Sequence, residues 1–81
     1  MKLRVQMFAI ARQYAGADVL EIELPTGATI ADLRQGLFAR LPELGSLGSR
    51  LLFAVNGEYA AETALLPPDC EVACIPPVSG G

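Results

Sequence analysis

Residues 29–41 form the one long segment of the chain with the apolar spacing of an amphipathic helix. Thr29 is a suitable N-cap, and Asp32, three residues later, can complete a capping box and favour the positive helix end. Pro42 ends the segment. One apolar stripe runs along it, made of Ile30, Leu33, Leu37, Phe38 and Leu41. A helix with a single apolar face has to pack on another layer, which the remaining residues must supply.

Much of the remaining chain has the patterns of short strands. Residues 2–9 alternate between apolar and polar, with Phe8 as an aromatic on the otherwise polar face. Residues 18–24 alternate in the same way. Between them, residues 11–15 predict a short helical turn, which Gly16 ends. The two strands would then form a hairpin-like pair.

The second half predicts three more strands. Residues 45–49 carry glycine and serine and predict a loop. Residues 51–55 are almost continuously apolar, which predicts a strand covered on both faces. The tight-turn dipeptide Asn56-Gly57 precedes a brief edge strand at 58–60, and the last strand is predicted at 71–75.

This order of elements is that of an α+β fold, the ubiquitin-like β-grasp. We expect a mixed sheet of four or five strands with the main helix packed across it and a short helical turn after the first strand. The first and last strands should lie side by side at the middle of the sheet. The 81 residues make one small domain. We place the domain at residues 1–75 and a flexible tail, ending in Gly-Gly, at residues 76–81.

Composition argues against several classes of function. Hydrophobic residues make up 52% of the chain, yet no apolar run approaches the roughly 20 residues of a membrane span. The formal net charge is −3 and the basic residues are scattered, so we expect no nucleic-acid partner. The N-terminal residues lack the apolar middle of a signal peptide, and we expect a cytoplasmic protein without membrane association.

Side chains for acid–base catalysis or metal binding are scarce. The chain has no histidine, so we expect no self-contained catalytic triad. Cys70 and Cys74 are too few thiols for a four-ligand zinc site, and in an extended segment their Cα atoms would lie roughly 13 Å apart, too far for a disulfide. We expect both to be buried fillers, and we expect no metal or cofactor bound by this chain.

The last residues, Val78-Ser79-Gly80-Gly81, follow Ile75-Pro76-Pro77. Glycines without Cβ atoms make a tail thin enough to thread a narrow channel and offer its carboxylate to another protein's active site. Two prolines at the base of this tail lower the entropy lost when it is ordered.

Four segments resemble the small, sulfur-carrying subunit of molybdopterin synthase, a ubiquitin-like sulfur carrier. They are Phe8-Ala9-x-Ala11-Arg12, Leu24-Pro25-x-Gly27-Ala28-Thr29, Val55-Asn56-Gly57-Glu58-Tyr59 and residues 71–81. The ending Pro-Pro-Val-Ser-Gly-Gly is the most specific part of the resemblance. One departure is that the family usually has a Gly-Asp pair where this chain has Asp69-Cys70.

The resemblance implies a non-catalytic carrier on which other proteins act. An E1-like activating enzyme would adenylate the Gly81 carboxylate with ATP and magnesium, and a sulfur donor protein would convert the adenylate to a thiocarboxylate. The tail would then enter the large synthase subunit, and two such deliveries would build the dithiolene of molybdopterin from a cyclic pterin monophosphate. The working synthase would be a heterotetramer of two small and two large subunits. The implied tail residues are Pro76, Pro77, Val78, Ser79 and Gly80.

A docking surface is expected beside this tail. On the sheet, Phe8 and Ile75 should point away from the helix-covered core on neighbouring strands, with Tyr59 close by. In the family, apolar residues at these positions bind both the activating enzyme and the large subunit. The resemblance therefore implies that Phe8, Tyr59 and Ile75 bind partners. Arg12 could add a charged contact, or it could simply be solvated on a helix surface.

Three alternatives stay open. A carrier for the thiamine thiazole or for a thiolated nucleotide would use the same tail chemistry. A ubiquitin-like protein modifier would form isopeptide bonds with target lysines, although Lys2 is the only lysine of this chain and offers little for chain building. A plain interaction domain would have an incidental Gly-Gly end.

Overall fold

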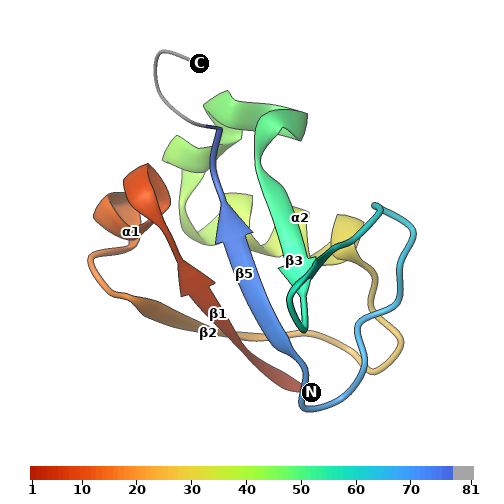
Figure 1. Cartoon of the computed structure of the whole chain (residues 1–81). Coiled ribbons are helices and arrows are strands. Elements are labelled where there is room, and N and C mark those ends of the chain that lie inside the picture. The colour runs from red at the N-terminus through yellow and green to blue at the C-terminus, as the bar shows by residue number, and fades with distance from the viewer. Residues whose placement is uncertain (78–81) are drawn as a thin grey trace.

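The last strand of the chain lies at the centre of a five-stranded mixed sheet. The computed structural model describes residues 1–77 (Figure 1). The strands lie in the order β2-β1-β5-β3-β4, with β1 and β5 parallel and the other neighbours antiparallel. The elements are β1 (Lys2–Met7), α1 (Ala9–Ala15), β2 (Val19–Glu23), α2 (Ile30–Arg40), the 3-10 segment η1 (Pro42–Arg50), β3 (Leu52–Val55), β4 (Glu58–Tyr59) and β5 (Glu71–Ile75). This arrangement confirms the predicted α+β, ubiquitin-like β-grasp fold.

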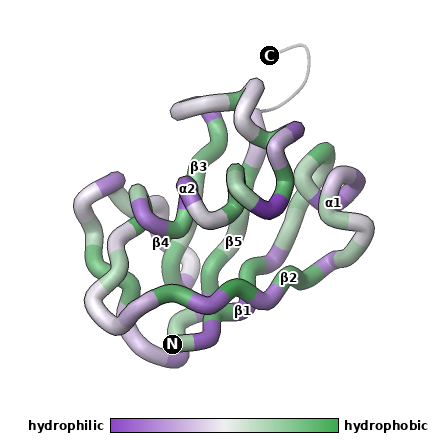
Figure 2. Tube along the Cα trace, turned by 180° about the vertical axis from the view of Figure 1, so that it is seen from behind, coloured by the Kyte–Doolittle hydropathy of each residue, from purple (hydrophilic) through white to green (hydrophobic). Residues whose placement is uncertain are grey.

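The main helix α2 covers one face of the sheet (Figures 1 and 2). Strand alternation places one set of side chains of β1 and β5 under this helix and leaves the other set on the opposite face. The buried core joins the sheet to the apolar stripe of α2. Its largest fully buried members are Phe53, Leu3, Ile30, Leu33, Leu37, Leu44, Leu51, Val5, Val72 and Cys74.

The start of α2 has the predicted capping box. The Asp32 backbone N–H donates to Thr29 Oγ1 over 3.3 Å, and the Thr29 backbone N–H donates to the Asp32 carboxylate over 2.9 Å. These two bonds satisfy N–H groups that a helix start otherwise leaves without partners.

Two predicted elements are different in the structure. The segment expected as a loop at 45–49 is part of η1, which contains a non-helical residue at Gly48 (φ 54°, ψ −133°) and buries Leu44. The strand at 51–55 is not covered on both faces, because the Leu52 side chain lies on the face opposite α2 and is 47% exposed. Alternation within β3 explains this, since Phe53 takes the buried side.

Two chain turns need left-handed backbone. Asn56 and Gly57 have φ of 51° and 86°, which matches the tight hairpin turn that their sequence predicts. Asp69 also has a positive φ of 59° just before β5, at the place where the resembling family usually has glycine. Aspartate tolerates this region better than most side chains, so the turn keeps its geometry without glycine.

The described chain ends just after β5. Pro76, which we expected to begin the tail, is buried, and Pro77 is exposed. The other expected tail residues, Val78 to Gly81, lie outside the described residues. Within residues 1–77, no helix is long and apolar enough to cross a membrane.

Candidate functional site

The sheet face turned away from α2 carries an exposed apolar patch. Strand register brings its members together, because Leu52 on β3 lies opposite Ile75 on β5, and Tyr59 on β4 lies opposite Ala54, two residues along β3. Met7 is the register partner of Cys74, so extended Phe8 (φ −119°, ψ 152°) lies level with Ile75 and points opposite to buried Met7. We call Phe8, Leu52, Tyr59 and Ile75 the open-face patch.

Three members of the open-face patch are among the most exposed large apolar side chains of the described chain. Phe8 is 45% exposed, Leu52 47% and Tyr59 71%, while Ile75 is half-buried between its neighbours. An exposed apolar cluster of this kind, unlike a single exposed leucine, indicates a surface that another molecule covers. The structure therefore brings together the three apolar residues predicted for docking.

Leu52 is a patch member that sequence reasoning missed. It stands inside the apolar run 51–55, where every position looked equally buried. Period-two counting from Phe53, the bulkiest residue of the run, would have placed Leu52 on the same face as Ile75.

The patch lies at the end of the sheet from which the chain leaves. β5 ends at Ile75, which is itself a patch member. The next residue, Pro76, is buried against the domain. β1 runs parallel to β5 and leads into Phe8 and α1 at the same end (Figure 1). A partner on the patch would therefore lie next to the root of the C-terminal segment.

Arg12 lies on α1, the helix that begins directly after Phe8. Its guanidinium forms an exposed ion pair with Asp18, at 3.7 Å between Nη1 and Oδ1. Exposed pairs of this kind contribute about 1 kcal/mol or less. Arg12 thus has an intramolecular partner, and this pair is weak enough to be exchanged for a charge on another protein.

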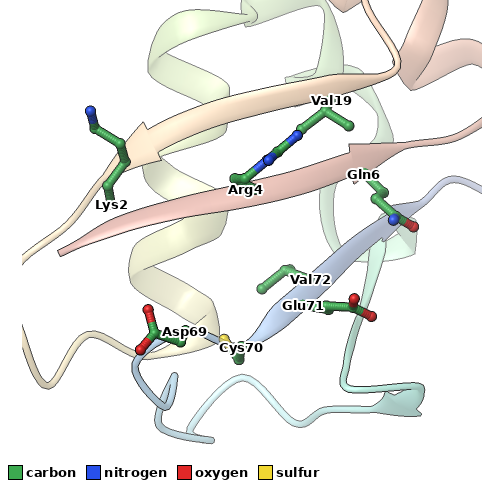
Figure 3. A pocket seen from close by; sticks show the side chains of 8 residues that line it. All are labelled: Lys2, Arg4, Gln6, Val19, Asp69, Cys70, Glu71 and Val72. Atoms are coloured by element: carbon green, nitrogen blue, oxygen red, sulfur yellow. The ribbon is translucent and has the colours of Figure 1, made fainter.

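The same sheet face is hollowed at its other end (Figure 3). The hollow has a volume of about 450 Å³ and is bounded by β1, β2, β5 and the turn before β5. Lys2 and Arg4 line it from one side, and Asp69 and Glu71 line it from the other. Its two positive and two negative charges cancel, and the Cys70 thiol, whose pKa burial raises, also lines it.

Both cysteines are buried, as predicted, and both are free thiols. Burial raises the pKa of Cys74 to about 12, an effect that the nearby positive charge of Arg34 opposes. Burial also raises the pKa of Cys70. A thiol of this kind stays protonated at neutral pH and is a poor nucleophile. Among residues 1–77, no three histidine, cysteine, aspartate or glutamate side chains are grouped to hold a metal ion.

The chain is similar over its whole length to known small proteins of one family. The ThiS family matches residues 5–81. The molybdopterin synthase sulfur carrier subunit of Chlamydomonas reinhardtii is 39% identical over 83 residues, covering all of both chains. That of Arabidopsis thaliana is 33% identical over 81 residues, covering all of this chain and 84% of the other. The crystal structure of SAMP1 from Haloferax volcanii is 28% identical, with full coverage of both chains and a TM-score of 0.85.

Proposed function

This chain belongs to the ThiS family, and from its full-length similarity to molybdopterin synthase sulfur carrier subunits we propose that it is such a subunit. The proposal agrees with the chemistry of the side chains, because burial raises the pKa of both thiols and makes them poor nucleophiles at neutral pH. The reactive group would then be the chain-terminal carboxylate of Gly81. That residue lies outside the described part of the chain, so its role is a proposal from the sequence.

Activation of Gly81 would precede sulfur transfer. A carboxylate is a poor electrophile because its negative charge repels nucleophiles and its leaving group is bad, and attachment of AMP by an E1-like enzyme with ATP and magnesium corrects both. A sulfur donor protein would then displace AMP and leave a thiocarboxylate on Gly81. That sulfur would attack the cyclic pterin monophosphate in the large subunit, and water would then cleave the bond between the sulfur and the Gly81 carbonyl, which leaves the sulfur on the pterin and a carboxylate on Gly81. Two such rounds, catalysed by side chains of the large subunit, would complete the dithiolene.

The position of the open-face patch carries the proposal. Ile75 is both a patch member and the last residue of β5, so a partner that covers the patch receives the following residues directly. Buried Pro76 and exposed Pro77 would give the tail a stiff base, and residues 78–81 would enter the partner's channel. Phe8, Leu52 and Tyr59 would supply the apolar contact, and Arg12 a charged contact at its edge.

The partners follow from this role. We propose a large synthase subunit, in a heterotetramer of two small and two large subunits, together with the activating enzyme and the sulfur donor. The activating enzyme and the large subunit would each have to receive the same chain end, so these two complexes with this chain would exclude one another. The carrier would work in the cytoplasm and would bind no cofactor itself.

Intact-mass spectrometry tests the proposal. After incubation with an activating enzyme, ATP, magnesium and a sulfide source, the mass of the chain should rise by the difference between sulfur and oxygen. A variant with one alanine added after Gly81 should fold normally, gain no sulfur and support no molybdopterin synthesis, since its reactive carbonyl is displaced. A Lys2→Arg variant, altered far from the tail, serves as the matched control and should react fully. Sulfur uptake and synthesis by the uncleaved extended variant would contradict the proposal.

A second function is favoured by one observation. The similar structure from Haloferax volcanii is that of SAMP1, and related solved structures bear the name small archaeal modifier protein. A modifier would join Gly81 to lysines of other proteins. Mass spectrometry of cell extracts separates the two roles. Arg50 is the last basic residue, so after tryptic digestion a modifier leaves residues 51–81 joined through Gly81 to target lysines, whereas a carrier gives this peptide only as the free acid or thioacid.

A further inference from the structure

Arg34 of α2 is a cationic side chain in an unusually enclosed place. Only 12% of its side chain is exposed, although its charge would favour full hydration. Its guanidinium lies over the Phe53 ring, with 5.1 Å between Cζ and the ring centroid. Phe53 is a fully buried residue of β3. Arg34 therefore connects the helix layer to the strand that carries part of the open-face patch.

Every side of the Arg34 guanidinium has a partner. Nη1 donates to the backbone carbonyl oxygens of Gly48 and Leu51, at 2.8 and 2.6 Å. Nε and Nη2 donate to the Glu62 carboxylate, with Nε at 3.1 and 3.2 Å from its two oxygens. Charge-assisted bonds to a carboxylate in this fork geometry are strong and directional.

The two carbonyls belong to the segment that leads from η1 into β3. Gly48 interrupts η1 with a non-helical backbone, and the local backbone bond at this end, from the Leu51 N–H to the Gly48 carbonyl, is long at 3.3 Å. Arg34 satisfies one carbonyl at the interruption and another at Leu51, where the chain turns into β3. The path of the chain just before β3 is thus set from the helix side.

Leu52 lies between the two residues that Arg34 holds. Arg34 bonds the carbonyl of Leu51, which precedes Leu52, and stacks on the ring of Phe53, which follows it. Leu52 is the first residue of β3, where its register partner is Ile75 of β5. Arg34 holds both neighbours of Leu52 from the core side. Because successive side chains of a strand point to opposite faces, the Leu52 side chain then points to the open face, beside Ile75.

We propose that Arg34 is a positioning residue for partner docking, which fixes Leu52 in the open-face patch without touching the partner. The inference rests on the proposed function, since the patch is the surface by which a carrier would bind the large subunit. A patch with a rigid apolar member loses less side-chain and backbone entropy on binding than one whose edge is free to move.

Lysine is the informative replacement at this position. Arg34→Lys keeps the charge, but one ammonium group cannot reach both carbonyls and the Glu62 carboxylate, and it cannot stack as a plane on Phe53. The 48–51 segment should therefore loosen while the core remains. We expect Arg34→Lys to weaken binding to the large subunit about tenfold.

A double-mutant cycle tests whether Arg34 acts through Leu52. Affinity for the large subunit is measured by calorimetry for Arg34→Lys, Leu52→Ala and the double variant, with urea unfolding measured on the same samples. If Arg34 works through Leu52, the tenfold loss should shrink to less than about twofold in the Leu52→Ala background. Arg34→Lys should still lower the urea midpoint in the Leu52→Ala background, because Leu52 is exposed and contributes little to the core.

Tyr59→Ala supplies the matched background. Tyr59 belongs to the same patch but lies on β4, which none of the bonds of Arg34 reaches. In this background Arg34→Lys should still weaken binding about tenfold. The inference would be overturned if Arg34→Lys reduced the affinity equally in the Leu52→Ala and Tyr59→Ala backgrounds, or if it did not reduce the affinity of the otherwise natural chain.

Failure of the inference and of the proposed function are distinguishable. If Tyr59→Ala weakens docking while Arg34→Lys leaves it unchanged, the positioning role is wrong and the carrier role stands. If the expected cycle is found but Gly81 never accepts sulfur, the positioning role stands and the proposed chemistry is wrong.

Discussion

At the scale of single residues, the position of a side chain decides whether it can react. Cys74 lies in β5, close to the end of the chain, and the sequence predicted it to be a buried filler. Its side chain is fully buried in the core beneath α2, and burial raises its pKa to about 12. Its thiol is therefore a packing group, which leaves the carriage of sulfur to another atom.

The raised pKa predicts how stability depends on pH. In the unfolded chain the Cys74 thiol ionises near its ordinary value of 9.0, whereas in the folded chain it ionises near 12. The folded state therefore holds a proton that the unfolded state releases, and stability is lost as pH rises from about 9 toward 12. Cys70, whose pKa is also raised, acts in the same direction.

Urea unfolding at several pH values checks this expectation. The midpoint should be steady below pH 9 and fall above it, and the fall should be shallower for Cys74→Ala than for the natural chain. The slopes of the midpoint against pH are compared, and not the midpoints themselves, because the cavity that alanine leaves lowers the midpoint at every pH. Parallel pH profiles of the two proteins would show that Cys74 contributes nothing to the pH dependence.

At the scale of elements, the start of α2 shows a local signal that survives folding unchanged. Thr29 and Asp32 form their capping box from side chains only three residues apart. We expect Thr29→Ala to lower the free energy of unfolding by about 1 kcal/mol, because the Asp32 N–H loses its acceptor. Thr29→Ser keeps the hydroxyl and should stay near the natural value in the same urea titration. A Thr29→Ala chain as stable as the natural one would refute this assignment.

Gly48 gives a second prediction, in η1. Its φ of 54° with ψ of −133° is a conformation that residues with a Cβ adopt only under strain. Gly48→Ala should therefore destabilise the fold by roughly 1 to 3 kcal/mol. Gly45→Ala is the control in the same segment, since a Cβ there meets no atom within 4 Å and its φ is not positive. Thermal unfolding should separate the two variants, and equal melting temperatures would exclude strain at Gly48.

The sequence predicted those elements whose signals are local. Alternation in residues 2–9 and the spacing of residues 29–41 each need only neighbours in the chain, and both β1 and α2 lie where they were expected. η1 was missed because its path depends on distant partners, above all the bonds from Arg34 to the Gly48 and Leu51 carbonyls. No spacing rule connects position 34 with positions 48 and 51.

Some residues of the candidate site could also be predicted from local patterns, whereas Leu52 could not. Strand alternation predicted that Phe8 and Ile75 point away from the core with Tyr59 close by, and the family resemblance added their role in docking. Leu52 could be recognised only through the register of β3 against β5, where it faces Ile75. A run of apolar letters hides such a residue, because the letters do not say which face is covered.

At the scale of the whole molecule, the fold and the tail are expected to be separable. A chain lacking residues 78–81 should keep its circular dichroism spectrum and its melting temperature, because the described core ends before them. It should accept no sulfur. A chain lacking residues 71–81 should be unfolded, since β1 and β3 both pair with β5 and would lose their common neighbour. Cooperative melting of this shorter chain would contradict the central role of β5.

The central place of β5 has a consequence for synthesis in the cell. Residues 71–75 are translated after every other described element, yet they close the sheet between β1 and β3. A nascent chain cannot finish folding while those residues are still inside the ribosome. A chain that is cut short before residue 71 would lack the strand that joins β1 to β3, and we expect it to stay unfolded and open to proteolysis.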